Sequence, residues 1–142
     1  MTVKVTGDPL GDIVPNIERA VNEAFSTFLV TTQGKLGKAN PKDTGRMASS
    51  WFIGRNRPSS EVQPQTWAPK QAKRYVQVKF GGPITFGGNW YLTNNVPYAN
   101  RVALDPVWAK NGGGGVNWYK SIVANMPADF RSELRETLRR LS

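Results

Sequence analysis

Apolar residues recur at helical spacing near the start of the chain and predict an amphipathic helix. Asp12 is suited to the N-cap position, and the apolar positions that follow lie three or four residues apart, at Ile13, Ile17, Val21, Ala24, Phe25 and Phe28. The positions between them carry polar and charged side chains, as expected for a solvent-facing side. We expect Gly34 to end this helix after about five turns, and residues 35–45 to form a loop.

Three later stretches carry the alternation or the β-branched and aromatic content of strands, at residues 50–54, 74–80 and 90–94. The alternation is most regular over 74–80. Between the first two strands, residues 55–70 contain Pro58, Pro64 and Pro69 and predict a long loop or extended arm, which includes Trp67. The glycine-rich residues 81–89 are expected to connect the last two strands as a flexible hairpin loop.

The last third of the chain predicts a short helix, a loop and a long helix. Pro97 can open a helix that continues through Leu104, and residues 105–116, with four consecutive glycines, form a glycine-rich loop. A helical apolar stripe then runs to Leu141, with Pro127 breaking or bending it. The whole chain, 1–142, thus predicts one α+β domain: an N-terminal amphipathic helix, a small and mainly antiparallel sheet with long loops, and a kinked C-terminal helix packed on the sheet.

The composition removes most catalytic chemistry. The 142 residues include no cysteine and no histidine, which excludes thiolate nucleophiles, sulfur-based metal sites and histidine-dependent proton relays. The acidic residues do not cluster as metal ligands, so we expect no enzyme activity, no cofactor and no metal. The N-terminus lacks the apolar core of a signal peptide, and no stretch approaches the roughly 20 apolar residues of a membrane span. We expect a soluble protein, made and used without secretion, with no membrane partner.

Two glycine-containing segments match catalytic motifs only superficially. Asp43-Thr44-Gly45 spells the triplet of aspartic proteases, but it follows Asn40-Pro41-Lys42 instead of a buried apolar strand. The run of four glycines is not followed by the Gly-Lys-Ser/Thr of a phosphate-binding loop. Neither segment predicts chemistry.

Positive charge is concentrated in the middle of the chain. The net charge is +9, and ten basic but only two acidic residues lie between Lys35 and Lys79. This distribution indicates either an ordinary solvated surface or a face that meets an anion, either nucleic acid or an acidic protein surface. The candidates for such a face are Arg55, Arg57, Lys70, Lys73 and Arg74. Aromatic residues interleave with them, as in grooves that bind single-stranded nucleic acid, but their positions in the predicted strands favour core packing over such a groove.

Two short segments resemble a known group of virion proteins. Residues 40–51 read Asn-Pro-Lys-Asp-Thr-Gly-Arg-Met-Ala-Ser-Ser-Trp and resemble the P-x-D-T-G-R-L-x-x-S-W segment of small tailed-phage proteins of the lambdoid tail-completion and head–tail joining group. Residues 94–102, Asn-Asn-Val-Pro-Tyr-Ala-Asn-Arg-Val, are similar to a second signature of that group, N-x-V-x-Y-A-x-x-x-E. The chain departs from the group after this point, with Ala103-Leu104-Asp105-Pro106 where relatives place Glu-x-Gly.

The resemblance implies a structural virion protein without chemistry of its own. It implies a cyclic homo-oligomer, a hexamer or a dodecamer, that forms a ring at the head–tail junction, with genomic DNA passing weakly bound through its lumen. Its neighbours would be neck, portal-adaptor or tail-tube proteins, and it would be made in the host bacterial cytoplasm. Tail terminator, tail-completion and neck-adaptor roles all stay open. The alternative is a basic protein that binds nucleic acid without sequence preference.

Structural or interface roles are expected for the residues of these segments, together with Trp67 of the arm: Asp43, Thr44, Gly45, Arg46, Trp51, Trp67, Asn95, Pro97 and Tyr98. Asp43 and Thr44 are expected to cap a turn over 46–49, and Gly45 to permit a tight bend. Arg46 is expected to pair with an acid of a neighbour. Tyr98 is expected to place its ring in the core while its hydroxyl reaches a loop.

Overall fold

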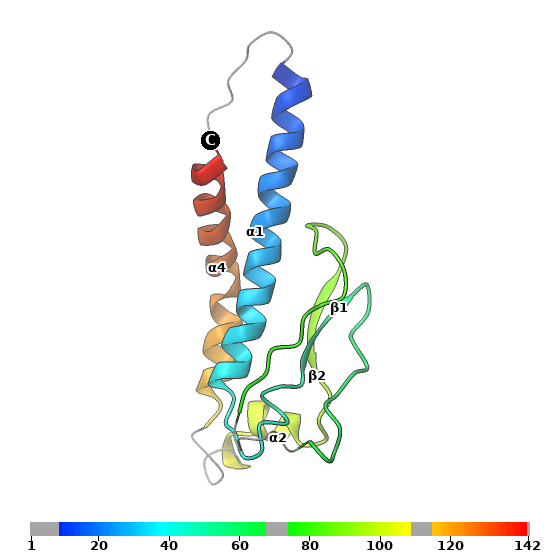
Figure 1. The fold of residues 1–142 in the computed structure, drawn as a ribbon. Helices are drawn as coiled ribbons and strands as arrows, with labels where there is room; N and C mark the ends of the chain where they lie inside the picture. The colour runs from blue at the N-terminus through cyan, green and yellow to red at the C-terminus, as the bar shows by residue number, and fades with distance from the viewer. Residues whose placement is uncertain (1–8, 68–73, 109–114, 142) are drawn as a thin grey trace.

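The computed structural model describes residues 9–67, 74–108 and 115–141 of the chain (Figure 1). Its elements follow in the order α1 (Pro9–Ala39), β1 (Trp51–Arg55), β2 (Trp90–Asn94), α2 (Ala99–Leu104) and α4 (Asn117–Leu141). This order confirms the α+β class, with a helix at each end of the described chain and an antiparallel pair of strands between them.

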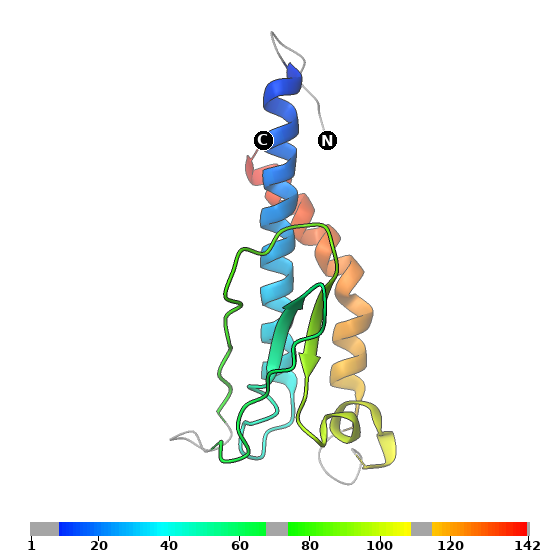
Figure 2. The same cartoon turned by 90° about the vertical axis from the view of Figure 1, so that its right-hand side faces the viewer.

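The two long helices lie side by side and antiparallel, and α1 extends well beyond the strands (Figures 1 and 2). At 1.5 Å per residue, the 31 residues of α1 span about 46 Å. Two ion pairs join the helices at the surface, Lys35 with Asp129 at 3.0 Å and Arg140 with Glu23 at 2.7 Å. The paired residues are about equally far apart on each helix and run in opposite order, which fixes the antiparallel register.

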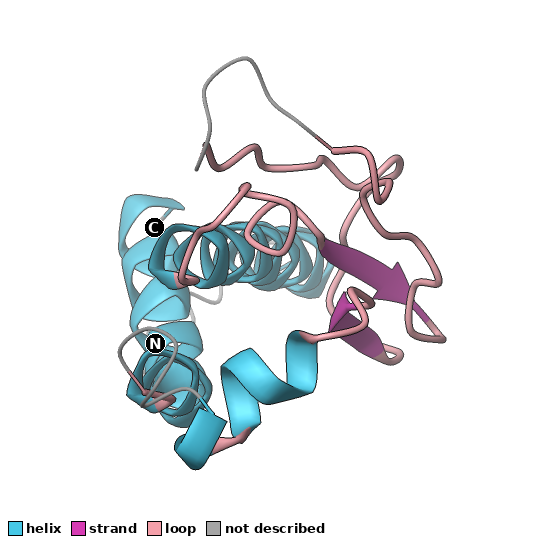
Figure 3. Ribbon diagram, turned by 90° about the horizontal axis from the view of Figure 1, so that it is seen from below, coloured by secondary structure: helices cyan, strands magenta, loops and turns pink. Residues whose placement is uncertain are grey.

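The strands form a two-stranded antiparallel sheet beside the C-terminal half of α1 (Figure 1). Trp51 lies opposite Asn94, and Arg55 lies opposite Trp90. The first four residues of β1 are buried. Trp51 and Ile53 share the face that α1 and α4 cover, while Gly54, which faces the other side, lies against residues 57–59. Viewed from below, the helices gather on one side and the strands with their long loops on the other (Figure 3).

Two apolar clusters hold these layers together. The first surrounds Trp51 and includes Leu36, Met47, Val96, Val102 and Ala103, with Trp118, Tyr119 and Ile122 of α4 packed against it. The second combines Phe28, Leu29 and Ile53 with aromatic residues, among them Phe130 of α4. The C-terminal helix therefore packs mainly against α1, and its side chains also reach the sheet.

The first long helix departs from the sequence-based expectation. The prediction that Gly34 ends the first helix is wrong: α1 begins at Pro9 and continues to Ala39. It continues because Leu29, Gln33 and Leu36 keep the buried face at helical spacing, while a Cβ on Gly37 would come within 2.0 Å of the Tyr75 ring. The glycine thus permits a close approach instead of ending the helix.

The C-terminal helix α4 is a single helix that runs through Pro127 and bends part-way along (Figure 2), so of the two expected outcomes, a break or a bend, the structure has the bend. A proline in a helix leaves the carbonyl four residues earlier without its donor. That residue, Val123, and Pro127 are both exposed, so water can reach the freed carbonyl.

Residues 74–80, the most regular strand pattern in the sequence, do not form a strand in this structure. They are extended, but side chains instead of a neighbouring backbone hold them: Ser49 Oγ accepts from the Val76 N–H at 2.8 Å, and Gln33 Nε2 donates to the Val78 carbonyl at 2.8 Å. The expected loop over 105–116 is also partly wrong, since residues 106–108 are helical. Residues 109–114 lie outside the described residues.

Candidate functional site

The segment after α1 forms a tight turn that begins at a capped helix end. Lys42 Nζ donates to the carbonyls of Lys38, at 2.6 Å, and Asn40, at 3.0 Å, and so satisfies the last turn of α1. Partial burial lowers the pKa of Lys42 from its ordinary value because desolvation disfavours the ammonium form.

The turn over 46–49 forms as expected, with one of its two predicted caps. Thr44 Oγ1 accepts a hydrogen bond from the Arg46 N–H at 3.2 Å, and the Ser49 N–H donates to the Gly45 carbonyl at 3.0 Å. Asp43 is exposed and makes no hydrogen bond with the described residues, so its predicted capping role is wrong. Gly45 has φ of +85°, and a Cβ there would lie 2.1 Å from the Arg74 carbonyl oxygen. Both facts require glycine at this position.

Arg46 fastens the long arm that follows β1. Its Nε donates to the Gln63 carbonyl at 2.9 Å, while its own carbonyl accepts from Ser50 Oγ at 2.6 Å. Ser50 Oγ in turn accepts from the Gln63 N–H at 3.1 Å, which closes the connection. Arg46 makes no ion pair with any described residue, so its pairing with an acid of a neighbour stays a prediction.

The second segment of the resemblance meets the first directly. Asn94 Nδ2 donates to the Met47 carbonyl at 2.8 Å, and Asn94 lies opposite Trp51 in the sheet. Asn95 Nδ2 donates to the carbonyls of Ser59, at 2.7 Å, and Glu61, at 3.0 Å, and so holds the arm from the other side. Sequence reasoning singled out Asn95 but missed Asn94, whose register opposite Trp51 is set by strand pairing.

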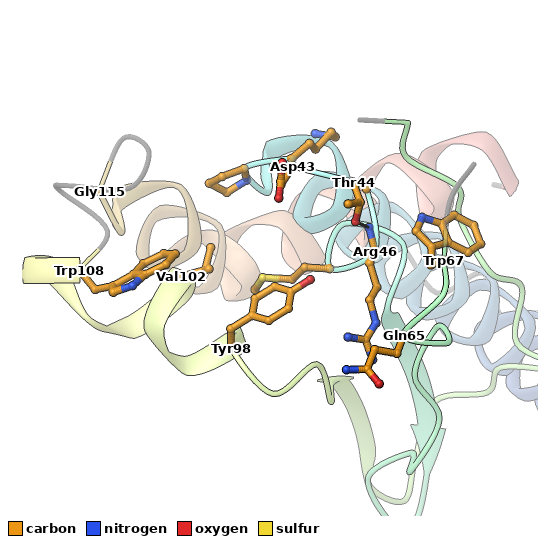
Figure 4. Close-up of a pocket in the computed structure, with 13 residues that line it drawn as sticks. Asp43, Thr44, Arg46, Gln65, Trp67, Tyr98, Val102, Trp108 and Gly115 are labelled. Carbon is orange, nitrogen blue, oxygen red and sulfur yellow. Dashed lines mark hydrogen bonds between the residues drawn. The ribbon is translucent and has the colours of Figure 1, made fainter. Parts of the chain in front are cut away.

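A pocket of about 740 Å³ lies between these segments (Figure 4). Tyr98 and Trp108 line one side of it, and Arg46, Gln65 and Trp67 line the other. Its remaining lining comes from residues 41–45, Met47, Val102 and Gly115. Three aromatic rings and two basic side chains, those of Lys42 and Arg46, therefore line one pocket that is open to solvent.

Tyr98 and Trp108 both line the pocket, which the sequence did not predict for either residue. The ring of Tyr98 lines the pocket and the residue is 37% exposed, so the prediction that it docks in the core is wrong. Trp108 was not singled out; Asp105 Oδ1 caps its short helical segment by accepting from the N–H groups of Val107 and Trp108, at 3.0 and 3.2 Å. An Asp that precedes Pro-Val-Trp was the sequence signal for this cap.

The other singled-out residues divide between core and surface. Trp51 is buried, donates its Nε1–H to Asn40 Oδ1 at 3.0 Å and stacks on Tyr119 with ring centroids 6.2 Å apart. Pro97 is exposed just before Tyr98. Trp67 is half-buried, and its Nε1 has no partner among the described residues.

The basic candidates are spread along the sheet. Arg55 lies at one end of β1, with its guanidinium 5.5 Å from the centre of the Trp90 ring, and the exposed Arg57 follows it. The Arg74 carbonyl lies near Ser49, beyond the other end of β1. The length of β1, about 13 Å, therefore separates it from Arg55. Lys70 and Lys73 lie outside the described residues.

The described ranges 9–67, 74–108 and 115–141 hold no group of three or more residues able to ligate a metal ion. Within the same ranges, no helix combines the length and the apolar character that crossing a bilayer requires. Comparisons with protein-family models, with curated proteins and with solved structures find no match to this chain.

Proposed function

We propose that this chain is a structural subunit of a ring at the head–tail junction of a tailed phage, as a tail terminator, tail-completion or neck protein. The observation that carries the proposal is the meeting of two segments far apart in sequence, 40–51 and 94–102. They are joined by the hydrogen bond from Asn94 to Met47, and both contribute side chains to one pocket. Each segment alone is a short pattern, and their contact makes them a single structural unit.

The surface next to this pocket supports a role in assembly. Four apolar side chains are exposed at the α2 end: Tyr98 by 37%, Leu104 by 52%, Val107 by 72% and Trp108 by 39%. We call these residues the basal apolar patch. Exposed apolar patches of this kind are typical of protein interfaces, where aromatic residues are the usual anchors. Its occupant in the proposal is a neighbouring subunit or an adjoining neck, portal-adaptor or tail-tube protein.

The proposed role requires several subunits, because one subunit is too small to surround DNA. A domain of 142 residues has a radius of gyration of about 14 Å, too small to surround a DNA duplex alone. Several copies related by rotation, through head-to-tail contacts that close, provide a lumen. We propose a hexamer or a dodecamer with genomic DNA passing through it.

The test is imaging of phage particles that contain this chain. Ring density for the chain at the head–tail junction is the expected result. Density in the capsid shell, single copies, or absence of the chain from particles contradicts the proposal.

A pair of matched variants tests the basal apolar patch in assembly. Val107→Asp places a charge in the patch and is expected to leave heads and tails unjoined in an infected culture. Val123→Asp places the same charge at a residue that is 40% exposed on α4, outside the patch, and is expected to leave joining intact. Equal loss of joined particles in both variants would mean that the patch has no special role.

Nucleic-acid binding is the second candidate, supported by the exposed Arg57 and Arg74, which make no ion pair with any described residue. Binding by phosphate contacts weakens steeply with salt because counterions are released. We expect only weak, non-specific binding by the free protein, measured by fluorescence anisotropy at several salt concentrations. Nanomolar binding near physiological salt that is lost when Lys70, Lys73 and Arg74 are neutralised would favour this candidate over the ring.

A further inference from the structure

Residues 74–80 run beside α1 as an extended segment, and side chains bind two of the main-chain groups on its inner edge (Figure 2). Main-chain groups of alternate residues in an extended segment point to opposite sides. The Val76 N–H and the Val78 carbonyl face the body of the protein, where Ser49 Oγ accepts from the N–H and Gln33 Nε2 donates to the carbonyl. The Gln33 amide also donates to the Trp51 carbonyl at 2.8 Å, so it bridges the segment to β1 in place of a backbone ladder.

The outer edge of the same segment is open. The main-chain N–H and C=O groups of Tyr75, Gln77 and Lys79 have no hydrogen-bond partner among the described residues. Gln77 and Lys79 are exposed, and the segment follows the outer margin of the molecule on the side of α1 away from β2 (Figure 2). Three alternate residues with unpaired main-chain groups form a template for one more strand.

We propose that residues 2–6 of a second copy of this chain add to this edge as a strand. The segment reads Thr-Val-Lys-Val-Thr, with β-branched residues at four of its five positions, and it has the same length as β1 and β2. Residues 1–8 lie outside the described residues, so this part of the inference rests on their sequence.

The side chains of that segment match the surface beside the edge. Gln77 Nε2 donates to the Val30 carbonyl at 2.9 Å, which places the edge next to Val30 on α1. Val30 is 40% exposed. In an added strand, Val3 and Val5 share one face and cover this apolar side chain, while Lys4 projects from the opposite face.

The donor must be another copy, because the chain's own segment cannot reach. Gly34 of α1 lies beside Gln77, since a Cβ there would be 3.5 Å from Gln77 Oε1, and 25 residues of helix separate Gly34 from Pro9, a distance of about 38 Å. Thr6 is three residues from Pro9 and can lie no more than about 11 Å from it. Residues 2–6 of one copy thus meet the 74–80 edge of the next, a head-to-tail contact that closes into a ring or continues as a filament.

Pairing of this edge with the same edge of another copy is disfavoured. Arg74 and Lys79 flank the edge, and antiparallel pairing of two such edges would bring these like charges together. The inference deepens the proposed function and rests on it for the place of the contact in a virion. The contact itself is measurable in the isolated chain, so its failure is distinguishable from absence of the chain at the head–tail junction.

The experiment is sedimentation of the full chain over a range of concentrations, with two matched pairs of variants. Lys79→Pro removes an outward-facing N–H, whereas Lys79→Ala keeps it. Val5→Pro removes strand pairing from the donor segment, whereas Val5→Thr keeps a β-branched residue with its N–H. Circular dichroism checks that each variant retains its helices.

We expect the wild-type chain to associate with increasing concentration, and both proline variants to weaken association by about tenfold or more. Lys79→Ala and Val5→Thr should stay close to wild type. A wild-type chain that stays monomeric up to its solubility limit would overturn the proposal. Association that survives Val5→Pro would overturn it too, even if Lys79→Pro abolished it, because another segment would then occupy the edge.

Discussion

Buried polar side chains join segments of this protein that share no backbone pairing. Gln33 and Ser49 are 1% exposed, and they bind residues 76 and 78 to the body of the molecule. Asn40 is also 1% exposed and accepts the indole N–H of Trp51. Side-chain hydrogen bonds from single buried residues therefore hold residues 76 and 78, where a larger sheet would use the backbone hydrogen bonds of a third strand.

Gln33→Leu should be strongly destabilising. The leucine fills a similar volume but leaves the carbonyls of Trp51 and Val78 without their donor in a buried site. We expect a loss of about 2–4 kcal/mol in the free energy of unfolding, measured by urea denaturation. Thr31→Ala on the exposed face of α1 is the control and should change stability by about 0.5 kcal/mol or less. A Gln33→Leu loss no larger than that of the control would contradict the bridging role.

Tyr75→Phe should alter the dependence of stability on alkaline pH. The Tyr75 hydroxyl is buried without a partner among the described residues, and burial raises the pKa of Tyr75 above its ordinary value of 10.0. Above about pH 10 the unfolded chain loses this proton first, so the folded state binds more protons and stability falls as pH rises. Phenylalanine lacks this proton, so the variant should lose less stability.

Urea denaturation of both proteins near pH 7 and pH 11 measures the effect. Near pH 7 we expect the variant to be as stable as wild type or up to about 1 kcal/mol more stable, because an unsatisfied hydroxyl is gone. The lowered pKa of Lys42 acts with the opposite sign and is present in both proteins, so it cancels in the comparison. Identical alkaline losses in the two proteins would contradict the assignment to Tyr75.

At the scale of elements, aromatic packing decides how α4 lies on α1. Phe130 contacts three rings, with centroids 5.9 Å from Phe25, 5.5 Å from Phe28 and 5.9 Å from Phe86. It therefore connects both helices with the loop that precedes β2. The two surface ion pairs between the helices add orientation but little stability, because exposed charges are screened by solvent.

Phe130→Ala should weaken the docking of α4. We expect a loss of about 2–4 kcal/mol in unfolding free energy, somewhat below that of a fully buried phenylalanine because Phe130 is only half-buried. Lys35→Ala, which removes one of the ion pairs, is the matched comparison and should cost about 1 kcal/mol or less. Thermal unfolding followed by far-ultraviolet circular dichroism measures both. A larger loss for Lys35→Ala than for Phe130→Ala would reverse this ranking of the two interactions.

The whole molecule carries a charge of +9, and many of its basic residues lie at the surface. Net charge of this size destabilises a compact state through self-repulsion, and added salt screens that repulsion. The same charge is available to acidic surfaces of neighbouring subunits, where it would guide assembly. The effect of this net charge on stability therefore comes from the whole set of charges and not from any single ion pair.

Salt should raise the melting temperature of the free protein. We expect Tm to increase by a few degrees between about 20 mM and 200 mM NaCl at constant pH. A variant with both Arg57→Gln and Arg74→Gln should show a smaller increase, since two exposed positive charges are gone. Differential scanning calorimetry measures both proteins. A Tm that falls with added salt would mean that favourable ion pairs outweigh repulsion.

Local patterns in the sequence determined several elements of this protein. The apolar spacing predicted both long helices, and residue types predicted one strand within one residue of Trp51–Arg55 and another with the bounds of Trp90–Asn94. These predictions succeeded because the periodic burial of a helix or strand appears as a periodic pattern of apolar residues within a short stretch of sequence. The turn after α1 was also predictable, because it depends on local features: the Thr44 side chain binds the N–H of Arg46, and Gly45 has a positive φ.

Long-range contacts decided the rest. Gly34 did not end α1, because Leu36 of the next turn is buried and residues 74–80 lie close against the helix at Gly37. Residues 74–80 have a strand's alternation, yet a strand needs a paired backbone, and Gln33 and Ser49 occupy their inner edge. The pocket between Arg46, Tyr98 and Trp108 likewise depends on chain segments that only the folded structure brings together. A pattern of side chains sets what a segment can form, and the partner that the tertiary structure supplies sets what it does form.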